Sequence, residues 1–356
     1  MSEMILAINP GSTSSKLGLY KELEEVFVEN ISHSSKELNE FEKITDQMDL
    51  RLSYILEFLS EKEIKLGKLS AVVGRGGLLK SVPGGTYAVN KKMVEDLKIG
   101  IQGEHASNLG GLLAKAIADK TNIPAYIVDP VVVDELQPEA RLSGIPELER
   151  ASIFHALNQK AVARKYAKEN NLNYEDITVI VAHLGGGISV GIHKKGKVID
   201  VNDALSGEGP FSPNRSGGLP TFDFFELCYN DDYSYSEIKK RLVGNGGVVA
   251  YLGTNDMREV EKRIKTGDKK AELVFKAMAY QTAKEIASLS PVNKGKIDAI
   301  ILTGGIAYSK YFIEHVKELV KFIAPIKIYP GEEELKSLAS GAYRVLKGEE
   351  QVKKYG

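Results

Sequence analysis

The segment Ile5-Leu6-Ala7-Ile8-Asn9-Pro10-Gly11-Ser12-Thr13-Ser14-Ser15-Lys16 passes from an apolar run into a polar turn that contains a glycine. A second apolar run follows from Leu17 to Tyr20, and the residues from Glu25 to Ile31 have the composition of a third strand. Apolar runs bounded by Gly, Pro, Asn and Ser are typical of strands joined by tight turns. The chain is therefore expected to open with a strand, a turn and two further strands.

The same pattern returns near the middle of the 356-residue chain. Val179 to Ala182 is apolar, His183-Leu184-Gly185-Gly186-Gly187-Ile188-Ser189 contains the turn, and Val198 to Val201 is the third apolar run. Asn9 and His183 hold equivalent places in the two patterns. The repeat is far longer than a solenoid unit. Two interpretations remain open, a duplicated domain and a chance similarity of two β-hairpins.

The order of the expected elements favours two related mixed α/β domains. Helical spacing of apolar residues predicts helices over 38–61, 148–169 and 335–346, and apolar strands lie between them. The first domain is predicted to span 1–150 plus a C-terminal helical segment, 331–356, and the second to span 151–330. Since no low-complexity linker separates them, the domains are expected to face each other across a cleft, which is a common ligand site.

Composition excludes several classes of protein. Lys and Arg number 47 and Asp and Glu number 48, so the net charge of −1 argues against nucleic acid as the main partner. Cys228 is the single cysteine, which rules out an internal disulfide and a cysteine-based zinc site. No apolar run approaches the ~18–20 residues of a membrane helix. The start, Met1-Ser2-Glu3-Met4, lacks a signal-peptide layout, so a cytoplasmic protein without membrane partners is expected.

Three glycine-containing turns follow apolar strands and are candidate phosphate sites. They are the turn after Asn9, the turn after His183, and Leu302-Thr303-Gly304-Gly305-Ile306. Glycine permits close approach of the backbone, whose N–H groups then point at anions. Hydroxyl groups of Ser12, Thr13 and Ser14 add donors, and Lys16 adds positive charge. Neither a P-loop motif nor a G-x-G-x-x-G segment opening a helix is present, so those nucleotide folds are unsupported.

Five further motifs carry a resemblance to a known family. They are Gly-Arg-Gly-Gly (74–77), Gly-Glu-His-Ala-Ser-Asn-Leu-Gly-Gly (103–111), Asp-Pro-Val-Val-Val-Asp-Glu-Leu (129–136), Ser-Ile-Phe-His-Ala-Leu-Asn-Gln-Lys (152–160) and Gly-Glu-Gly-Pro-Phe-Ser-Pro-Asn-Arg-Ser-Gly (207–217). With the three turns, they resemble the acetokinase family, and within it the kinases that act on butyrate. The resemblance covers essentially the whole chain. It implies two RNase H-like domains of the actin-like ATPase fold.

The resemblance also implies a reaction, the reversible in-line transfer of the γ-phosphoryl group of ATP to butyrate or a similar short or branched-chain carboxylate. Arg75 and Arg215, each in a glycine-rich stretch, could be surface arginines, but the family places such a pair on the carboxylate and the moving phosphoryl group. His155 corresponds to a histidine that hydrogen-bonds that group. A general base is not required, because a carboxylate is already ionised at pH 7. Asp129, otherwise a turn residue, is implied near Mg²⁺ and the nucleophile.

The remaining implied residues divide by ligand. Asn9 and Glu333 are expected at Mg²⁺, the register among Glu332, Glu333 and Glu334 being open. The phosphates and the nucleoside of ATP or ADP are expected at Ser12, Thr13, Ser14, Lys16, His183, Gly185, Gly186, Gly187, Gly304, Gly305 and Ile306. The organic acid is expected at Gly77, His105 and Phe154. Gly77 could leave room for a longer acyl chain, or it could only permit a turn. No functional role is expected for His33, His193 or His315.

Two alternatives share the fold. A nucleotide-driven binding switch would bind ATP without dependence on a carboxylate. A sugar kinase would need a carboxylate base for an alcohol, and Asp129 could supply it. The resemblance to the acetokinase family further implies a homodimer or a higher homo-oligomer.

Overall fold

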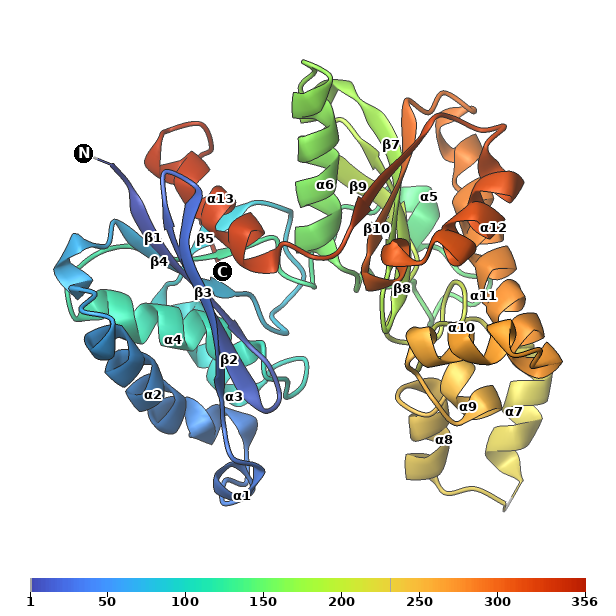
Figure 1. The fold of residues 1–356 in the computed structure, drawn as a ribbon, viewed down its shortest axis with the longest axis horizontal. Coiled ribbons are helices and arrows are strands. Elements are labelled where there is room, and N and C mark those ends of the chain that lie inside the picture. Colours follow the sequence, from blue (N-terminus) through green and yellow to red (C-terminus); the bar gives the residue numbers. More distant parts are fainter. Residues whose placement is uncertain (1, 231) are drawn as a thin grey trace. The chain divides into compact units, whose positions relative to one another are not determined.

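The computed structural model describes residues 2–230 and 232–356 (Figure 1). The chain divides into two compact units. Unit 1 comprises Met1–Val133 and Glu333–Gly356, and unit 2 comprises Asp134–Glu332.

In its described part, unit 1 is built on a seven-stranded sheet with the order β12-β5-β6-β4-β1-β2-β3. Its strands are β1 (Met4–Pro10), β2 (Ser14–Lys21), β3 (Glu24–Ser32), β4 (Ala71–Arg75), β5 (Thr86–Ala88), β6 (Ala125–Val128) and β12 (Lys353–Lys354). Its helices are α1 (Ser35–Leu38), α2 (Met48–Glu61), α3 (Lys91–Ile99), α4 (Asn108–Asp119) and α13 (Glu334–Leu346), with 3₁₀ turns η1 (Ile44–Gln47) and η2 (Leu66–Lys68).

The described residues of unit 2 form a five-stranded sheet with the order β11-β10-β7-β8-β9. Its strands are β7 (Thr178–Leu184), β8 (Ile188–Lys194), β9 (Lys197–Val201), β10 (Ala299–Gly304) and β11 (Ile326–Pro330). Its helices are α5 (Pro138–Arg141), α6 (Ala156–Glu169), α7 (Thr221–Tyr229), α8 (Tyr235–Leu242), α9 (Val248–Leu252), α10 (Met257–Lys265), α11 (Lys269–Ser288) and α12 (Lys310–Val320), with 3₁₀ turns η3 (Tyr174–Asp176), η4 (Ser290–Asn293) and η5 (Gly305–Tyr308).

The two sheets share one topology, which confirms that the chain is a duplication. In both, three antiparallel strands are followed by two parallel ones, in the order β3-β2-β1-β4-β6 in unit 1 and β9-β8-β7-β10-β11 in unit 2. A shift of register falls between Leu19 and Tyr20 of β2 and between Ile192 and His193 of β8. These are corresponding positions, since Asn9 pairs with Lys16 and His183 pairs with Ser189. A chance pair of hairpins would not share a bulge at the same place.

Alternation along the strands decides which helices each face receives. In unit 2, Val179 and Val181 of β7 pack with residues of α6, whereas Ile180 and Ala182 pack with α11 and α12. The strands are buried on both faces, which explains why their sequences read as continuous apolar runs. In unit 1, α4 and α13 (teal and red in Figure 1) likewise pack on the same central strands, β1, β4 and β6.

One helix of each copy is exchanged between the units. Helix α6 follows the last parallel strand of the first copy, β6, but packs on β7 and β10 of unit 2. Helix α13 follows the corresponding strand of the second copy, β11, but packs on β1, β4 and β6 of unit 1. One face of each sheet is therefore covered by a helix that comes, in the sequence, after the last parallel strand of the other sheet.

Two predicted helices are shorter than their apolar spacing suggested. The helix predicted over 38–61 begins only at Met48, and the Gln47 side chain donates to the carbonyl oxygen of Leu38 across the break at 3.4 Å. The helix predicted over 148–169 begins at Ala156. The backbone before Ala156 forms other hydrogen bonds: Arg150 N–H donates to the carbonyl oxygen of Arg141, and the carbonyl oxygen of Ile153 accepts Ala204 N–H. His155 therefore caps the helix instead of lying within it.

Strand β4 and helix α4 meet at two glycines. A Cβ at Gly74 would lie 2.0 Å from the carbonyl oxygen of Gly110, and a Cβ at Gly110 would lie 2.3 Å from that of Arg75. These contacts are backbone against backbone, so neither chain can yield by rotating a side chain. The crossing fixes Arg75, at the end of β4, beside the first turns of α4.

Gly74→Ala is expected to lower the free energy of unfolding by about 2–3 kcal/mol, because the added methyl group forces β4 and α4 apart. Gly67→Ala is the matched control, since a Cβ there meets no heavy atom of the described residues within 4 Å. Urea unfolding of both variants measures the difference. Equal stabilities would show that the crossing tolerates a side chain.

Candidate functional site

The turn between β1 and β2 is held from below by a buried guanidinium group. Arg51 of α2 is fully buried, and its Nη1 donates to the carbonyl oxygens of Gly11 (2.8 Å) and Ser14 (2.9 Å). Its Nη2 donates to that of Ser12 at 2.8 Å, while His33 N–H donates to Thr13 at 2.9 Å. With its carbonyl groups turned toward Arg51 and His33, the turn presents its N–H side on the other face, as an anion site requires.

The predicted phosphate-binding side chains of this turn are accessible. Ser12, Thr13 and Lys16 are exposed and Ser14 is half-buried, whereas the next hydroxyl, Ser15, is buried. The buried Ser15 Oγ lies 2.8 Å from His33 Nε2. Burial, and secondly the nearby Arg51 charge, lower the pKa of His33 to about 4. His33 is therefore neutral at physiological pH and acts as a support for the turn, which the sequence did not suggest.

A cavity of about 460 Å³ opens beside the same turn. Its lining combines polar groups with the apolar side chains of Pro10, Ile44 and Ala106; the other residues are Asn9, Gly11, Ser12, Gln47, Arg75, His105 and Ser107. Ser107 N–H donates to Nδ1 of His105 at 3.2 Å, so the ring proton of the neutral imidazole lies on Nε2. Unit 1 thus brings Asn9, the first turn, Arg75 and His105 to one cavity.

The glutamates at 332–334 have three different environments. Glu334 forms an ion pair with Arg75 and accepts a hydrogen bond of 2.5 Å from the Asn9 side chain. Glu332 lies 3.0 Å from Nε2 of His183. The side chain of Glu333 is 66% exposed and lies 3.9 Å from Lys336. Of the three, Glu334 is the carboxylate next to Asn9 and Arg75.

Two predicted residues of unit 1 lie in tightly packed backbone. A Cβ at Gly77 would lie 2.3 Å from Oδ1 of Asn108, so the idea that Gly77 leaves room for an acyl chain is wrong. Asn108 fills that space because its Oδ1 accepts Leu78 N–H and its Nδ2 donates to Gly103. Asp129 is buried at φ 37°, and its Oδ1 accepts Gly85 N–H at 2.7 Å.

In unit 2 the two predicted histidines stack. The rings of His155 and His183 are 3.7 Å apart and nearly parallel, with an angle of 7° between their planes. Nδ1 of His155 lies 2.9 Å from Ser189 Oγ, and Nδ1 of His183 lies 2.9 Å from Asn158 Oδ1. Both Nδ1 atoms are therefore engaged, and Nε2 of His183 faces Glu332 at 3.0 Å. Phe154, which precedes His155, is buried.

Arg215 lies against the second glycine turn. A Cβ at Gly187 would lie 2.2 Å from Arg215 Nη1, so the guanidinium group occupies the space that any side chain at 187 would take. Ser212 Oγ donates to the carbonyl oxygen of Gly186 at 2.6 Å. A Cβ at Gly185 would lie 2.9 Å from Nε2 of His183. Burial lowers the pKa of Arg215, with the Asp203 carboxylate opposing the shift.

The third turn continues β10. Gly304 has φ 88°, and a Cβ there would lie 2.4 Å from the carbonyl oxygen of Leu184 at the end of β7. At Gly305 a Cβ would meet no heavy atom of the described chain within 4 Å, whereas Ile306 is buried. Unit 2 therefore brings together His155, His183, the second turn and Arg215. The third turn, which follows β10, lies beside the end of β7.

Comparison with known proteins identifies the family. A model of the acetokinase family matches residues 146–339. Butyrate kinase 1 of Clostridium acetobutylicum is 55% identical over 351 residues, which cover 99% of each chain. This chain belongs to the acetokinase family. Two solved structures share its fold: the acetate kinase of Porphyromonas gingivalis (TM-score 0.79, 19% identity, covering 97% of this chain and 100% of that one) and a propionate kinase of Francisella tularensis (TM-score 0.74, 22% identity, 94% and 98%).

Membership of the acetokinase family confirms the resemblance predicted from the motifs, and the two solved structures confirm the predicted fold of two mixed sheets. Over residues 2–230 and 232–356, no cluster of three or more His, Cys, Asp or Glu side chains is placed to hold a metal ion. Within the same residues, no helix is both long and apolar enough to cross a membrane.

Sequence reasoning missed three residues that support the site. Arg51 lies on the buried face of α2, with Ile55 one turn later, and an arginine on such a face was the available signal. Asn108 lies within the motif that suggested His105, yet its bonds to Leu78 and Gly103 depend on the folded loops. Glu334 could not be distinguished from its two neighbours, because the register depends on where α13 begins.

Acid is expected to destabilise the first turn through His33. Its pKa is about 4 in the folded protein, below the ordinary value of about 6.5, so its contribution is present above pH 6.5 and is lost as the pH falls toward 4. His33→Gln keeps an amide near Ser15 but cannot titrate. Between pH 7 and 4 the free energy of unfolding of the wild type should fall by roughly 2–3 kcal/mol more than that of the variant. Urea unfolding at several pH values measures this, and parallel profiles would contradict it.

Proposed function

We propose that the protein is a butyrate kinase, which reversibly transfers the γ-phosphoryl group of ATP to butyrate or a similar short-chain carboxylate, giving an acyl phosphate and ADP. Its 55% identity to butyrate kinases 1 and 2 of Clostridium acetobutylicum over nearly the whole chain supports this reaction. One structural observation carries the proposal furthest. The turn between β1 and β2 and Arg75 line one cavity, which supports a site where a guanidinium group holds a carboxylate beside a phosphate.

The reaction needs fixed positive charge more than covalent chemistry. Arg75 would hold the carboxylate, and Arg215 would stabilise charge on the moving phosphoryl group. His155 would hydrogen-bond the moving phosphoryl group, and His183, which stacks on it, would reach a phosphate oxygen once Glu332 moves from its Nε2. Asp129 has its Oδ1 engaged by Gly85 N–H, which supports a structural role in the loop after β6 rather than the role of a base.

Mg²⁺ fits the Asn9 and Glu334 pair. Mg²⁺ prefers oxygen ligands and is commonly held by one or two carboxylates together with substrate phosphates and water. An amide and a carboxylate already meet here, and no all-protein cage is needed. When bound with ATP, the ion neutralises phosphate charge. Because Glu334 also pairs with Arg75, binding of this carboxylate to Mg²⁺ would weaken its ion pair with the guanidinium group that is proposed to hold the organic acid.

The apolar part of the cavity suits an aliphatic acid. Pro10, Ile44 and Ala106 would contact the acyl chain while Arg75 holds its carboxylate. Each buried methylene group contributes about 0.8 kcal/mol, so the preference for butyrate over acetate should stay within roughly one to two orders of magnitude.

Hydroxamate trapping with acetate, propionate, butyrate and isobutyrate tests the reaction, because only an acyl phosphate yields a hydroxamate. Butyrate or isobutyrate should give the highest kcat/KM. Arg75→Ala and Arg215→Ala should each lower kcat by about 10²–10³ with ATP binding largely kept, as expected for the loss of one fixed donor. An absence of hydroxamate with every acid would support the nucleotide switch or the sugar kinase instead, and near-normal turnover of a variant would remove that arginine from the mechanism.

Glu334→Gln should raise the Mg²⁺ concentration for half-maximal activity by at least about tenfold, because a ligand charge is lost. Glu333→Gln is the adjacent comparison, and its exposed side chain predicts a much smaller change. Titration of activity with Mg²⁺ at fixed ATP separates the two positions. A larger effect at Glu333 would return the metal site to the register expected from the sequence.

A further inference from the structure

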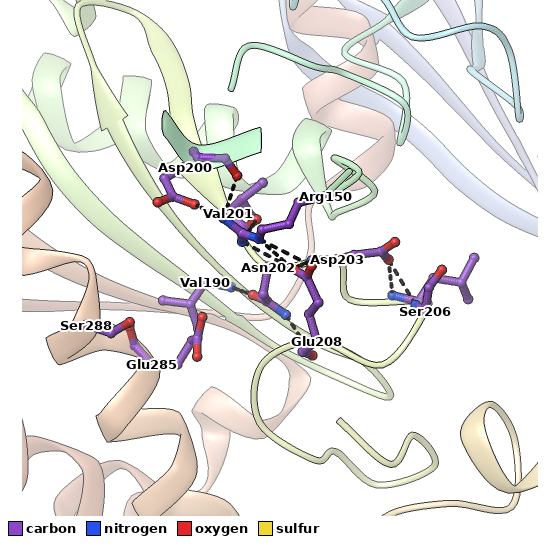
Figure 2. Close-up of polar contacts among 12 residues, drawn as sticks. Arg150, Val190, Asp200, Val201, Asn202, Asp203, Ser206, Glu208, Glu285 and Ser288 are labelled. Atoms are coloured by element: carbon purple, nitrogen blue, oxygen red, sulfur yellow. Dashed lines mark hydrogen bonds and ion pairs between the residues drawn. The ribbon is translucent and has the colours of Figure 1, made fainter. Parts of the chain in front are cut away.

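Arg150 lies in the irregular segment before α6, and its guanidinium group binds α5, β9 and the segment that follows β9 (Figure 2). Nη1 donates to the carbonyl oxygen of Ala140 at 2.8 Å and to Asp200 Oδ1 at 3.0 Å. Nη2 donates to the carbonyl oxygen of Val201 at 3.0 Å and to Glu208 Oε2 at 3.1 Å. The planar fork of arginine meets these fixed directions at once, which a lysine cannot do.

The surroundings of Arg150 are rich in carboxylates. Burial alone would lower its pKa, but hydrogen bonds to Glu208 and then Asp200 raise it overall. Glu285 of α11 faces the same group; burial raises its pKa, the Arg150 charge opposes this shift, and the charges of Glu208 and Asp200 add to it. Without the guanidinium group, three acidic side chains would be left close together around the end of β9.

Glu208, in turn, folds the segment that follows β9. Its Oε2 accepts Asp203 N–H at 3.0 Å, and Asp203 Oδ1 accepts the N–H groups of Leu205 (2.8 Å) and Ser206 (2.9 Å) (Figure 2). Asn202 ties this segment to the sheet, because its Oδ1 accepts Val190 N–H at 2.7 Å. The segment 202–208 is therefore a turn whose shape depends on two acidic side chains.

This turn supplies a contact of Arg215. The carbonyl oxygen of Ala204 accepts a hydrogen bond of 2.5 Å from Arg215 Nη1, the same atom that stands over Gly187. A continuous series of contacts thus runs from Arg150 through Glu208 and Asp203 to Ala204, and from there to Arg215.

We propose that Arg150 is a positioning residue that sets the place of the Arg215 guanidinium group by fixing the turn 202–208. The inference rests on the proposed function, in which Arg215 stabilises the moving phosphoryl group. Arg150 acts only through that turn, so its loss should affect kcat while leaving the apparent KM for ATP nearly unchanged.

The test compares Arg150→Ala with Arg263→Ala, a matched control from the same unit. Arg263 is similarly exposed (33% against 26%), pairs with Asp268 and donates to the carbonyl oxygen of Leu252. Arg150→Ala should lower kcat for butyrate by about 10–10²-fold, since a misplacement of about 1 Å has effects of that size. Arg150→Lys should recover only part of the loss, and Arg263→Ala should keep kcat within about threefold.

A double-mutant cycle with Arg215→Ala makes the test specific. If Arg150 acts through Arg215, its replacement in the Arg215→Ala background should change kcat by no more than about threefold. Hydrogen exchange of residues 203–208 should quicken in Arg150→Ala but not in Arg263→Ala, whatever the substrate. Glu208→Gln, a milder change, should lower kcat in the same direction if the alanine variant does not fold.

The outcomes separate the two claims. A wild type that forms no hydroxamate contradicts the proposed function alone, while the exchange of residues 203–208 still tests the contacts of Arg150. The positioning role would be overturned by any of three results for Arg150→Ala. These are unchanged hydrogen exchange of residues 203–208, a loss of kcat no larger than that of Arg263→Ala, and an equal loss of kcat with and without Arg215→Ala.

Discussion

The shape of the turn between β1 and β2, where we propose that phosphate binds, depends on one interaction. Arg51 donates hydrogen bonds to three of the turn's carbonyl oxygens. A turn that is free to rotate its peptide units would offer an anion both donors and acceptors. Holding the carbonyl oxygens on one side leaves the N–H groups on the other, which is the arrangement that the proposed phosphate site requires before any ligand arrives. This preorganisation requires a buried cation, which is why Arg51 lies under the turn rather than at its rim.

The duplication gave each unit a turn at the same place, and the two turns have diverged. Asn9 and His183 occupy equivalent positions, and each contacts a glutamate from the segment 332–334, Glu334 in unit 1 and Glu332 in unit 2. In unit 2 the guanidinium group of Arg215 lies over Gly187 instead of binding the carbonyl oxygens from beneath. In unit 1 an arginine thus fixes the carbonyl oxygens of the turn, whereas in unit 2 an arginine lies beside the turn and donates to Ala204.

Local sequence pattern predicted the elements whose partners are near in the chain. The hairpins, their glycine turns and the final helix were all readable, because alternation and turn chemistry act over a few residues. The positions of Arg51, Asn108 and Arg150 were not, since their hydrogen bonds join segments up to 58 residues apart. The same reason explains the helix predicted from residue 148. The backbone N–H of Arg150 bonds to Arg141 at the end of α5, and the carbonyl oxygen of Ile153 accepts Ala204 N–H from the turn after β9, and those bonds overrode helical spacing.

The exchanged helices have a consequence for how the chain is made. Synthesis proceeds from residue 1, so the sheet of unit 1 emerges long before α13, which covers one of its faces. All residues of unit 2 are synthesised in this interval, including those of α6, which packs on the sheet of unit 2. All of unit 2 is therefore synthesised before α13, and until that helix is made the sheet of unit 1 lacks the cover of one apolar face, which is the kind of exposed surface that promotes misfolding.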